Sequence, residues 1–182
     1  MSKFFRVSFL GFAALIVSML LSVSMPHDAS ANGCSLSSDE LIIANLMSTQ
    51  PEQTRPYLTC DPTLTYVARA RALDMGTRNY FGHTNPDGIG PNYLITQAGY
   101  QLPAWWGTHP SSNYVESIAA GTYMTPQDSW NAWMGSPGHR THLLAEIPFY
   151  SDQVAYGIGV VDVPGSVYSK YYVVLTAPLP NQ

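Results

Sequence analysis

The chain reads Trp133-Met134-Gly135-Ser136-Pro137-Gly138-His139-Arg140 past its middle, and this run is the most distinctive in the sequence. Two stretches upstream also combine turn residues with ionisable side chains. They read Asn79-Tyr80-Phe81-Gly82-His83-Thr84-Asn85-Pro86-Asp87-Gly88 and Tyr114-Val115-Glu116-Ser117-Ile118-Ala119-Ala120-Gly121. Imidazole and carboxylate groups can bind metal or carry protons. We expect the rest of the chain to be the frame that brings together His83, Glu116 and His139.

Several helices are predicted around these stretches. Ser37 followed by Glu40 is a capping-box pattern. Asp61-Pro62 is typical of a helix start, with apolar residues following at spacings of three and four: Leu64, Val67, Ala68, Ala72 and Met75. Shorter helices are predicted over 92–98, after Thr125-Pro126 and after Ser136-Pro137. The apolar face of the first helix is expected to carry Leu41, Ile42, Asn45 and Leu46, and the solvated side of the second Arg69, Arg71 and Arg78.

The end of the chain predicts β structure. Residues 154–163 and 170–177 are rich in Val and Tyr and are separated by Pro164-Gly165-Ser166, which indicates a hairpin. Residues 115–119 favour a short strand or extended edge. Both hairpin strands are apolar on both faces, so helices should cover both sides of the sheet. The predicted fold class is α+β, an α-β-α sandwich with helices on both sides of a small, mainly antiparallel sheet.

The first 31 residues have the layout of a secretory signal peptide. Lys3 and Arg6 precede the apolar run 7–23, and Ala29-Ser30-Ala31 is a small-x-small cleavage pattern. Residues 32–182 then form one domain, with a formal charge that changes from −4 to −5 when the leader is removed. This acidic balance argues against nucleic-acid partners. No second apolar span follows, so we expect the mature protein to be soluble. The leader predicts a secreted, extracellular or periplasmic protein, and we expect a monomer.

Cys34 and Cys60 are the only cysteines in the sequence. In an exported chain, two cysteines indicate one disulfide. The alternative is that Cys34 is a lipidated N-terminus, although Ala31-Asn32-Gly33 lacks the usual aliphatic residue before it.

The three motifs together resemble the CAP superfamily, also called the SCP domain. This superfamily contains the cysteine-rich secretory, antigen 5 and pathogenesis-related proteins. The likeness is strongest to short bacterial secreted members and covers roughly residues 39–178. Gly157-Ile158-Gly159-Val160 also resembles a strand of the family. The resemblance implies an α-β-α sandwich, in agreement with the pattern of the tail.

The resemblance also implies a cleft with two histidines and two acidic residues. His83 and His139 match the histidines, and Glu116 matches the first acid. Ser117 stands where the family usually has Asn, and Met134-Gly135 stand near the place of the second acid. The expected tetrad is therefore a triad in this chain.

Two imidazoles and a carboxylate can hold Zn²⁺ or another divalent metal with an open coordination position. The first hypothesis is thus a weakly held metal at His83 and His139, with Glu116 binding the ion or orienting a ligand. The structural alternative is a hydrogen-bonded His-Glu-His set that only holds the loops together.

Two further hypotheses concern the same cleft. General acid/base hydrolysis, peptidase-like, would use His83, Glu116 and His139. Ser136 lies three residues before His139, but it is better explained as an N-cap, and the metalloprotease His-Glu-x-x-His pattern does not occur. We therefore favour a binding module over an enzyme, with an extracellular lipid, glycan or protein as ligand. The candidate surface is aromatic: Tyr80, Trp105, Trp106 and Tyr114. The alternative is that these side chains pack under the loop as a small cluster. His142 is expected at the surface, and His109 in a loop that could approach the cleft.

Overall fold

The sheet at the centre of the molecule has four strands in the order β1-β3-β4-β2. The computed structural model describes residues 34–180, so the predicted signal peptide lies outside the described part of the chain. The strands are β1 (Thr59–Cys60), β2 (Glu116–Gly121), β3 (Ala155–Asp162) and β4 (Lys170–Ala177). β3 and β4 form the predicted antiparallel hairpin, β2 pairs antiparallel with β4, and β1 pairs parallel with β3.

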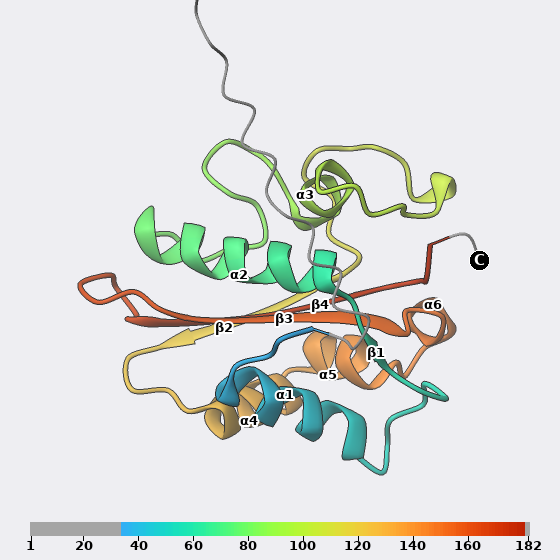
Figure 1. Cartoon of the computed structure of the whole chain (residues 1–182), viewed down its shortest axis with the longest axis horizontal. Helices are drawn as coiled ribbons and strands as arrows, with labels where there is room; N and C mark the ends of the chain where they lie inside the picture. The colour runs from blue at the N-terminus through green and yellow to red at the C-terminus, as the bar shows by residue number, and fades with distance from the viewer. Residues whose placement is uncertain (1–33, 181–182) are drawn as a thin grey trace, which may run out of the picture.

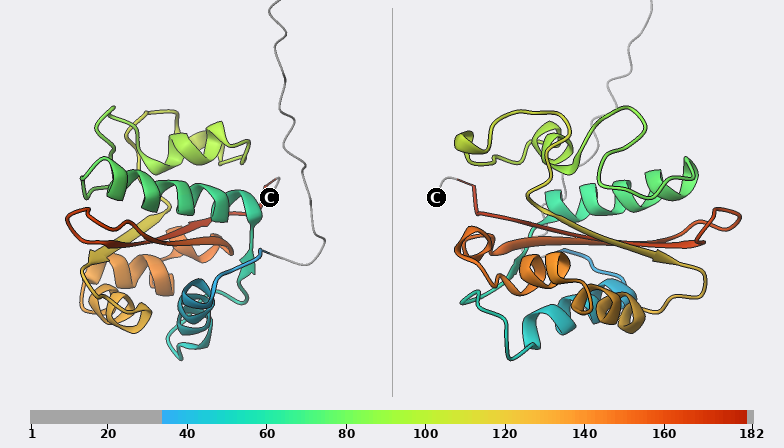
Figure 2. Two further views of the ribbon diagram at one scale, coloured as in Figure 1. Left: turned by 60° about the vertical axis from the view of Figure 1, so that its left-hand side comes forward. Right: turned by 180° about the vertical axis from the view of Figure 1, so that it is seen from behind.

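Helices cover both faces of this sheet, as predicted (Figure 1). On one face lie α2 (Pro62–Thr77) and α3 (Pro91–Gln97), and on the other α1 (Ser38–Thr49), α4 (Pro126–Met134) and α5 (Pro137–Leu144). The short helices η1 (Ala104–Trp106) and α6 (Pro148–Ser151) lie toward the same end of the sheet, which is clear when the molecule is turned (Figure 2). The predicted α-β-α sandwich is confirmed.

Strand β4 explains why the hairpin is apolar on both faces. Tyr171, Val173 and Leu175 belong to the core under α2, whereas Tyr172 and Val174 belong to the core that faces α1 and α4. Alternate side chains of a strand point to opposite faces. A strand between two helical layers must therefore be apolar at every position.

Two glycines of β3 set how closely α2 can approach the sheet. A Cβ placed on Gly157 would lie 2.1 Å from the backbone carbon of Leu64, and one on Gly159 would lie 2.3 Å from that of Ala68. Any side chain at either position would push the helix away. α2 is the helix that carries the predicted apolar stripe. These glycines set the distance between this helix and the sheet.

The predicted helix starts are confirmed, but the buried face of α1 is not the predicted one. Ser37 and Glu40 form the capping box. Ile43 and Met47 are fully buried, whereas Leu41 and Ile42 remain 51% and 44% exposed. Glu40 is buried on the same inner side of α1 and pairs with Arg69 of α2.

The carboxylate of Glu40 accepts from Arg69 Nε at 2.8 Å and from the backbone N–H of Val160 at 3.3 Å. Burial opposes ionisation of Glu40, but hydrogen bonds from Arg69 and the backbone outweigh it and lower the pKa of this carboxyl. The side of α1 that faces the sheet therefore combines the apolar Ile43, Ala44 and Met47 with a paired carboxylate.

The predicted disulfide is present. Cys34 is bonded to Cys60, with their Cα atoms 5.8 Å apart. This bond ties the first described residue to β1, directly before α2. The sulfur of Cys34 is thus occupied, as the disulfide interpretation predicted.

Candidate functional site

The segment that carries His83 leaves the end of α2 and is held by a turn. The side-chain oxygen of Asn85 accepts from the backbone N–H groups of Asp87 and Ile89, at 3.0 and 2.9 Å. Gly88 completes the turn with a φ of 80°, a conformation that glycine adopts readily. The predicted turn is therefore formed, and it places His83 opposite β2.

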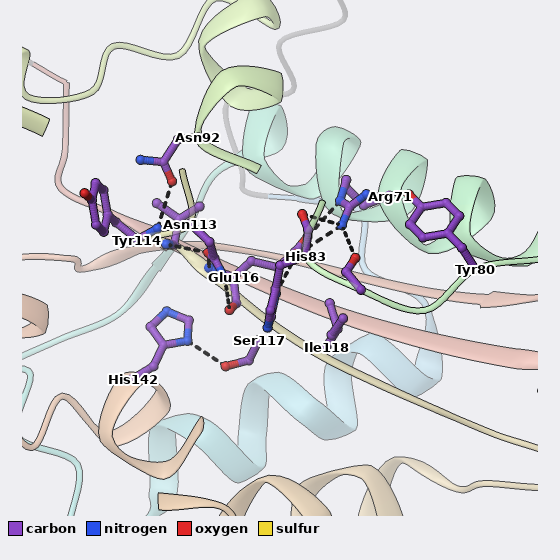
Figure 3. A network of polar contacts seen from close by, with 12 residues as sticks. Arg71, Tyr80, His83, Asn92, Asn113, Tyr114, Glu116, Ser117, Ile118 and His142 are labelled. Carbon is purple, nitrogen blue, oxygen red and sulfur yellow. Dashed lines mark hydrogen bonds and ion pairs between the residues drawn. The ribbon is translucent and has the colours of Figure 1, made fainter. Parts of the chain in front are cut away.

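Glu116 stands at the start of β2 and is buried against Arg71 of α2. Arg71 Nε donates to Glu116 Oε2 at 2.9 Å, and a second guanidinium nitrogen donates to Oε1 at 3.2 Å. The same guanidinium donates to the backbone oxygens of Gly82 and His83, at 2.9 and 3.1 Å. One buried arginine thus pairs the carboxylate and also fixes the loop that carries the histidine (Figure 3).

The contact between His83 and Glu116 sets which nitrogen of the imidazole is free. Nδ1 of His83 lies 3.0 Å from Oε1 of Glu116. An ionised carboxylate only accepts hydrogen bonds, so the proton of neutral His83 lies on Nδ1. The lone pair is then on Nε2, which makes this nitrogen the available metal ligand or base.

His139 approaches the same place from the first turns of α5. The centroids of the His83 and His139 rings are 6.4 Å apart. Nδ1 of His139 is buried and has no hydrogen-bond partner among the described residues. Burial, and then the neighbouring His83, lower the pKa of His139, so its imidazole is neutral at pH 7. The structure therefore brings the three predicted site residues together.

A cavity of about 200 Å³ opens between these side chains. The residues that line it come from the His83 segment, the start of β2, α5 and α6: His83, Asn113, Tyr114, Val115, Glu116, Ser117, Ser136, Gly138, His139, His142 and Tyr150. Among these described residues Glu116 is the only acid, and both of its oxygens already accept hydrogen bonds. The cavity thus offers polar groups to a ligand but no unpaired carboxylate.

A comparison with protein families agrees with the motifs. Residues 51–175 match the profile of the Cysteine-rich secretory protein family (CAP). The chain belongs to this family.

Two similar proteins come from the genus Bacillus. Over 116 residues it is 31% identical to the uncharacterized protein YkwD of Bacillus subtilis, a match that covers 64% of this chain and 39% of YkwD. A solved extracellular protein with an SCP domain from Bacillus anthracis is 25% identical, with a TM-score of 0.53 over 79% of this chain and 44% of that one. This CAP chain therefore spans less than half the length of either Bacillus protein.

A third likeness concerns the fold alone. A solved outer surface protein from Borrelia burgdorferi is 21% identical, with a TM-score of 0.58, and the match covers 81% of this chain and 99% of that one. Between residues 34 and 180 of this CAP domain, none of the helices is long and apolar enough to cross a bilayer.

Arg71 is the site residue that the sequence interpretation placed wrongly. It was expected on the solvated side of α2, but it is 2% exposed. Burial opposes its charge, yet Glu116 and Tyr80 outweigh burial and raise the pKa of Arg71. The signal was present in the spacing, because position 71 lies three and four residues after Ala68 and Val67 on the apolar stripe.

His142 was expected at the surface, and this prediction is also wrong. It is 4% exposed and contacts side chains of both β2 and β4. Nδ1 contacts the hydroxyl of Ser117 at 2.7 Å, and Nε2 contacts the hydroxyl of Thr176 at 2.7 Å. Thr176 in turn donates to Gln153 Oε1 at 2.7 Å, and Gln153 donates to the backbone oxygen of Tyr114 at 3.1 Å.

The donor and the acceptor of each hydrogen bond in this chain follow from Gln153 at its end. The amide nitrogen of Gln153 donates, so its oxygen must accept from Thr176. Thr176 then accepts from Nε2–H of His142, and Nδ1 of His142 accepts from Ser117. Burial, followed by the nearby Arg55, lowers the pKa of His142 well below its usual 6.5. His142 is therefore a neutral, fully bonded wall of the cavity.

The remaining predicted site residues are divided between core and surface. Tyr80 donates to Asp74 and accepts from Arg71. Trp106 is buried, whereas Trp105 is 75% exposed. Ser136 occupies the N-cap position of α5, although its hydroxyl makes no capping bond.

His109 does not join the cavity lining. Its Nδ1 contacts the hydroxyl of Ser111 in the exposed loop at 3.1 Å. His109→Ala is therefore a suitable control for substitutions of the two site histidines.

Proposed function

We propose that this chain is a secreted binding module whose cleft holds a divalent transition-metal ion through His83 and His139. Glu116 accepts a hydrogen bond from Nδ1 of His83 and so fixes the orientation and the tautomer of the ring. The observation that carries the proposal is the approach of two imidazoles, on separate elements, to one polar cavity.

Three observations support export. Residues 1–31 have the pattern of a secretory leader. The bond between Cys34 and Cys60 suits an oxidising compartment. The relatives include an extracellular protein and an outer surface protein.

The distance between the two rings is compatible with a shared ion after a small adjustment. Zn–N bonds of about 2.0–2.1 Å in a tetrahedral site place the centroids of two imidazole ligands roughly 5 Å apart. The observed separation is 6.4 Å, and side-chain rotation can close a difference of this size. The buried, unpartnered Nδ1 of His139 also gains a partner if an ion or an ion-bound water enters.

The donor set predicts weak binding. Within residues 34–180, no three His, Cys, Asp or Glu side chains are grouped closely enough to hold a metal together. Glu116 is committed to Arg71 and His83. Two imidazoles and water would complete the coordination, and a bound ion would supply Lewis acidity or a bridge to an external ligand.

A contact between a serine and a histidine is the one observation that favours hydrolysis. Ser117 donates to Nδ1 of His142, as a serine nucleophile donates to its base. Ser117 is, however, fully buried. Burial also keeps the pKa of His142 well below the range suited to a base at neutral pH. Binding therefore explains the cavity better than catalysis by this pair.

Isothermal titration with Zn²⁺ tests the proposal. The protein is first stripped with EDTA and desalted. We expect a single-site heat for the wild type and for the control His109→Ala, whose imidazole lies in an exposed loop. His83→Ala and His139→Ala should each abolish this heat. Equal heats in the wild type and His83→Ala would exclude the metal.

The structural alternative has its own outcome in the same experiment. If the His-Glu-His set only holds the loops, the wild type gives no Zn²⁺ heat. His83→Ala then lowers the melting temperature more than His109→Ala does. That combination would replace the metal site by a structural role.

A further inference from the structure

Aromatic side chains beyond the cavity form a continuous row that ends in an exposed indole. We define the aromatic ledge as Trp105, Phe149, Tyr114 and Tyr150. The Trp105 and Phe149 centroids are 6.1 Å apart, and Phe149 lies 5.7 Å from Tyr114 and 5.0 Å from Tyr150. Tyr114 and Tyr150 are themselves walls of the cavity. The ledge therefore runs from the cavity to the exposed indole of Trp105.

The base of the ledge is held firmly by the fold. Trp106, directly after Trp105 in η1, is 6% exposed. Its ring stacks on Phe149 of α6 with a centroid separation of 5.5 Å and an interplanar angle of 28°. Trp106 thus anchors η1 to α6, and Trp105 is presented on a supported surface rather than on a free loop.

The contacts that Trp105 makes with its neighbours leave most of its indole exposed. Its indole meets Trp106 and Phe149 edge to face, at interplanar angles of 86° and 84°, and stays 75% exposed. Ile147, one residue before α6, is also 45% exposed. Exposed aromatic and aliphatic surface next to a cavity marks an interaction site.

The chemistry of the ledge and the cavity restricts the ligand. Glu116 is neutralised by Arg71, so no free charge faces the cavity from that side. Glu116 is the only acid among the described residues that line the cavity, and neither Lys nor Arg is among them. The partner should therefore be uncharged, with flat apolar faces for the rings and hydroxyl groups for the polar walls.

We propose that the aromatic ledge and the neighbouring cavity bind a neutral oligosaccharide. One sugar ring stacks on Trp105, and a terminal unit places its hydroxyls beside Ser136 and His139. The proposal extends the binding role given above, but it depends on the ledge and not on a bound metal.

Two other partners fit the structure less well. A lipid tail needs an apolar cavity, whereas this one is lined mainly by polar side chains and its 200 Å³ is smaller than the roughly 300–1,000 Å³ of drug-sized ligand sites. An extended peptide would need a free sheet edge. The outer edge of β2 is partly occupied by side chains. Asn113 bonds both the N–H and the C=O of Glu116, and Trp133 Nε1 donates to the C=O of Ile118.

Direct titration with defined glycans tests the inference. The probes are cellotetraose, chitotetraose and maltotetraose. Their binding is measured in EDTA by calorimetry and by tryptophan fluorescence. We expect at least one to bind to the wild type with a change in indole emission. Trp105→Ala should weaken that binding at least about tenfold, the loss typical of a truncated aromatic anchor.

Tyr123→Ala is the matched control. Tyr123 is 94% exposed and follows the end of β2 opposite to Glu116, so its loss should leave the affinity unchanged. Trp105→Phe keeps a stacking face and should lose less affinity than Trp105→Ala. Zinc heats should be the same in Trp105→Ala and the wild type.

Three results would overturn the inference. They are absence of binding to all three tetrasaccharides, equal affinities for wild type and Trp105→Ala, or binding to uncharged phosphatidylcholine vesicles in place of the sugars. Zinc binding without sugar binding would refute the ledge proposal and leave the metal site intact. Sugar binding without zinc binding would refute the metal site and leave the ledge proposal intact.

Discussion

Replacing Arg71 by Met should be among the most damaging single changes to this protein. The side chain of Arg71 is 1% exposed and that of its partner Glu116 is 0% exposed. Arg71→Met leaves a buried carboxylate with only His83 beside it and removes the donors to two backbone oxygens. Breaking a buried ion pair on one side lowers the free energy of unfolding by about 3–5 kcal/mol. That is a large part of the roughly 5–15 kcal/mol typical of a whole domain.

The magnitude can be measured by urea unfolding with the disulfide intact. The buried Trp130 and Trp133 report on the core by fluorescence, and the midpoint shift at constant m-value gives the change. Arg78→Met is the matched control, because Arg78 belongs to the end of the same helix and pairs with Asp87 at the surface. This control should leave the midpoint almost unchanged.

A double-mutant cycle with Glu116→Gln then isolates the pair. If the loss arises from an uncompensated carboxylate, Arg71→Met should cost less when Glu116 is already neutral. The coupling for residues in contact is expected at about 0.5–3 kcal/mol. A loss below about 1 kcal/mol in Arg71→Met, or additivity within about 0.5 kcal/mol, would refute the reasoning. Arg71→Lys keeps the charge without the planar fork and should fall between wild type and Arg71→Met.

The remaining predictions concern the covalent link and the buried imidazole. Cys34→Ser with Cys60→Ser opens a bridge across 26 positions and should lower the free energy of unfolding by about 3–4 kcal/mol; a midpoint identical to that of the oxidised wild type would contradict this. His142 stays neutral in the fold while the unfolded chain takes a proton below 6.5, so stability should fall with decreasing pH below that value. The slope should approach about 1.4 kcal/mol per pH unit for this group. His142→Asn should flatten the slope between about pH 6.5 and 5 in EDTA, and equal slopes in both proteins would show that His142 is not the titrating group.

Much of the architecture was predictable because its signals are local. Capping residues, the apolar stripe of α2 and the turn at Asn85 are patterns within a few residues of one another, and all were confirmed. The two-sided apolar pattern of residues 154–163 and 170–177 predicted the second layer of helices. The three motifs placed His83, Glu116 and His139 at one cavity.

The buried polar groups were not predictable in the same way. Ser117, His142 and Thr176 have no distinctive local pattern, and they meet only because β2, α5 and β4 pack together. Arg71 is polar on an apolar stripe, and its burial depends on a carboxylate 45 residues away. Glu40 is likewise buried through its pair with Arg69, whereas Leu41 and Ile42 remain exposed.

The sequence alone therefore determined the family, the layers of the sandwich and the three motif residues, because each depends on patterns within one segment. The tertiary structure decided which charges are buried, which nitrogen of His83 is free, and that Trp105 continues the wall of the cavity. Those properties depend on desolvation and on partners from distant elements, and the elements must pack before either exists.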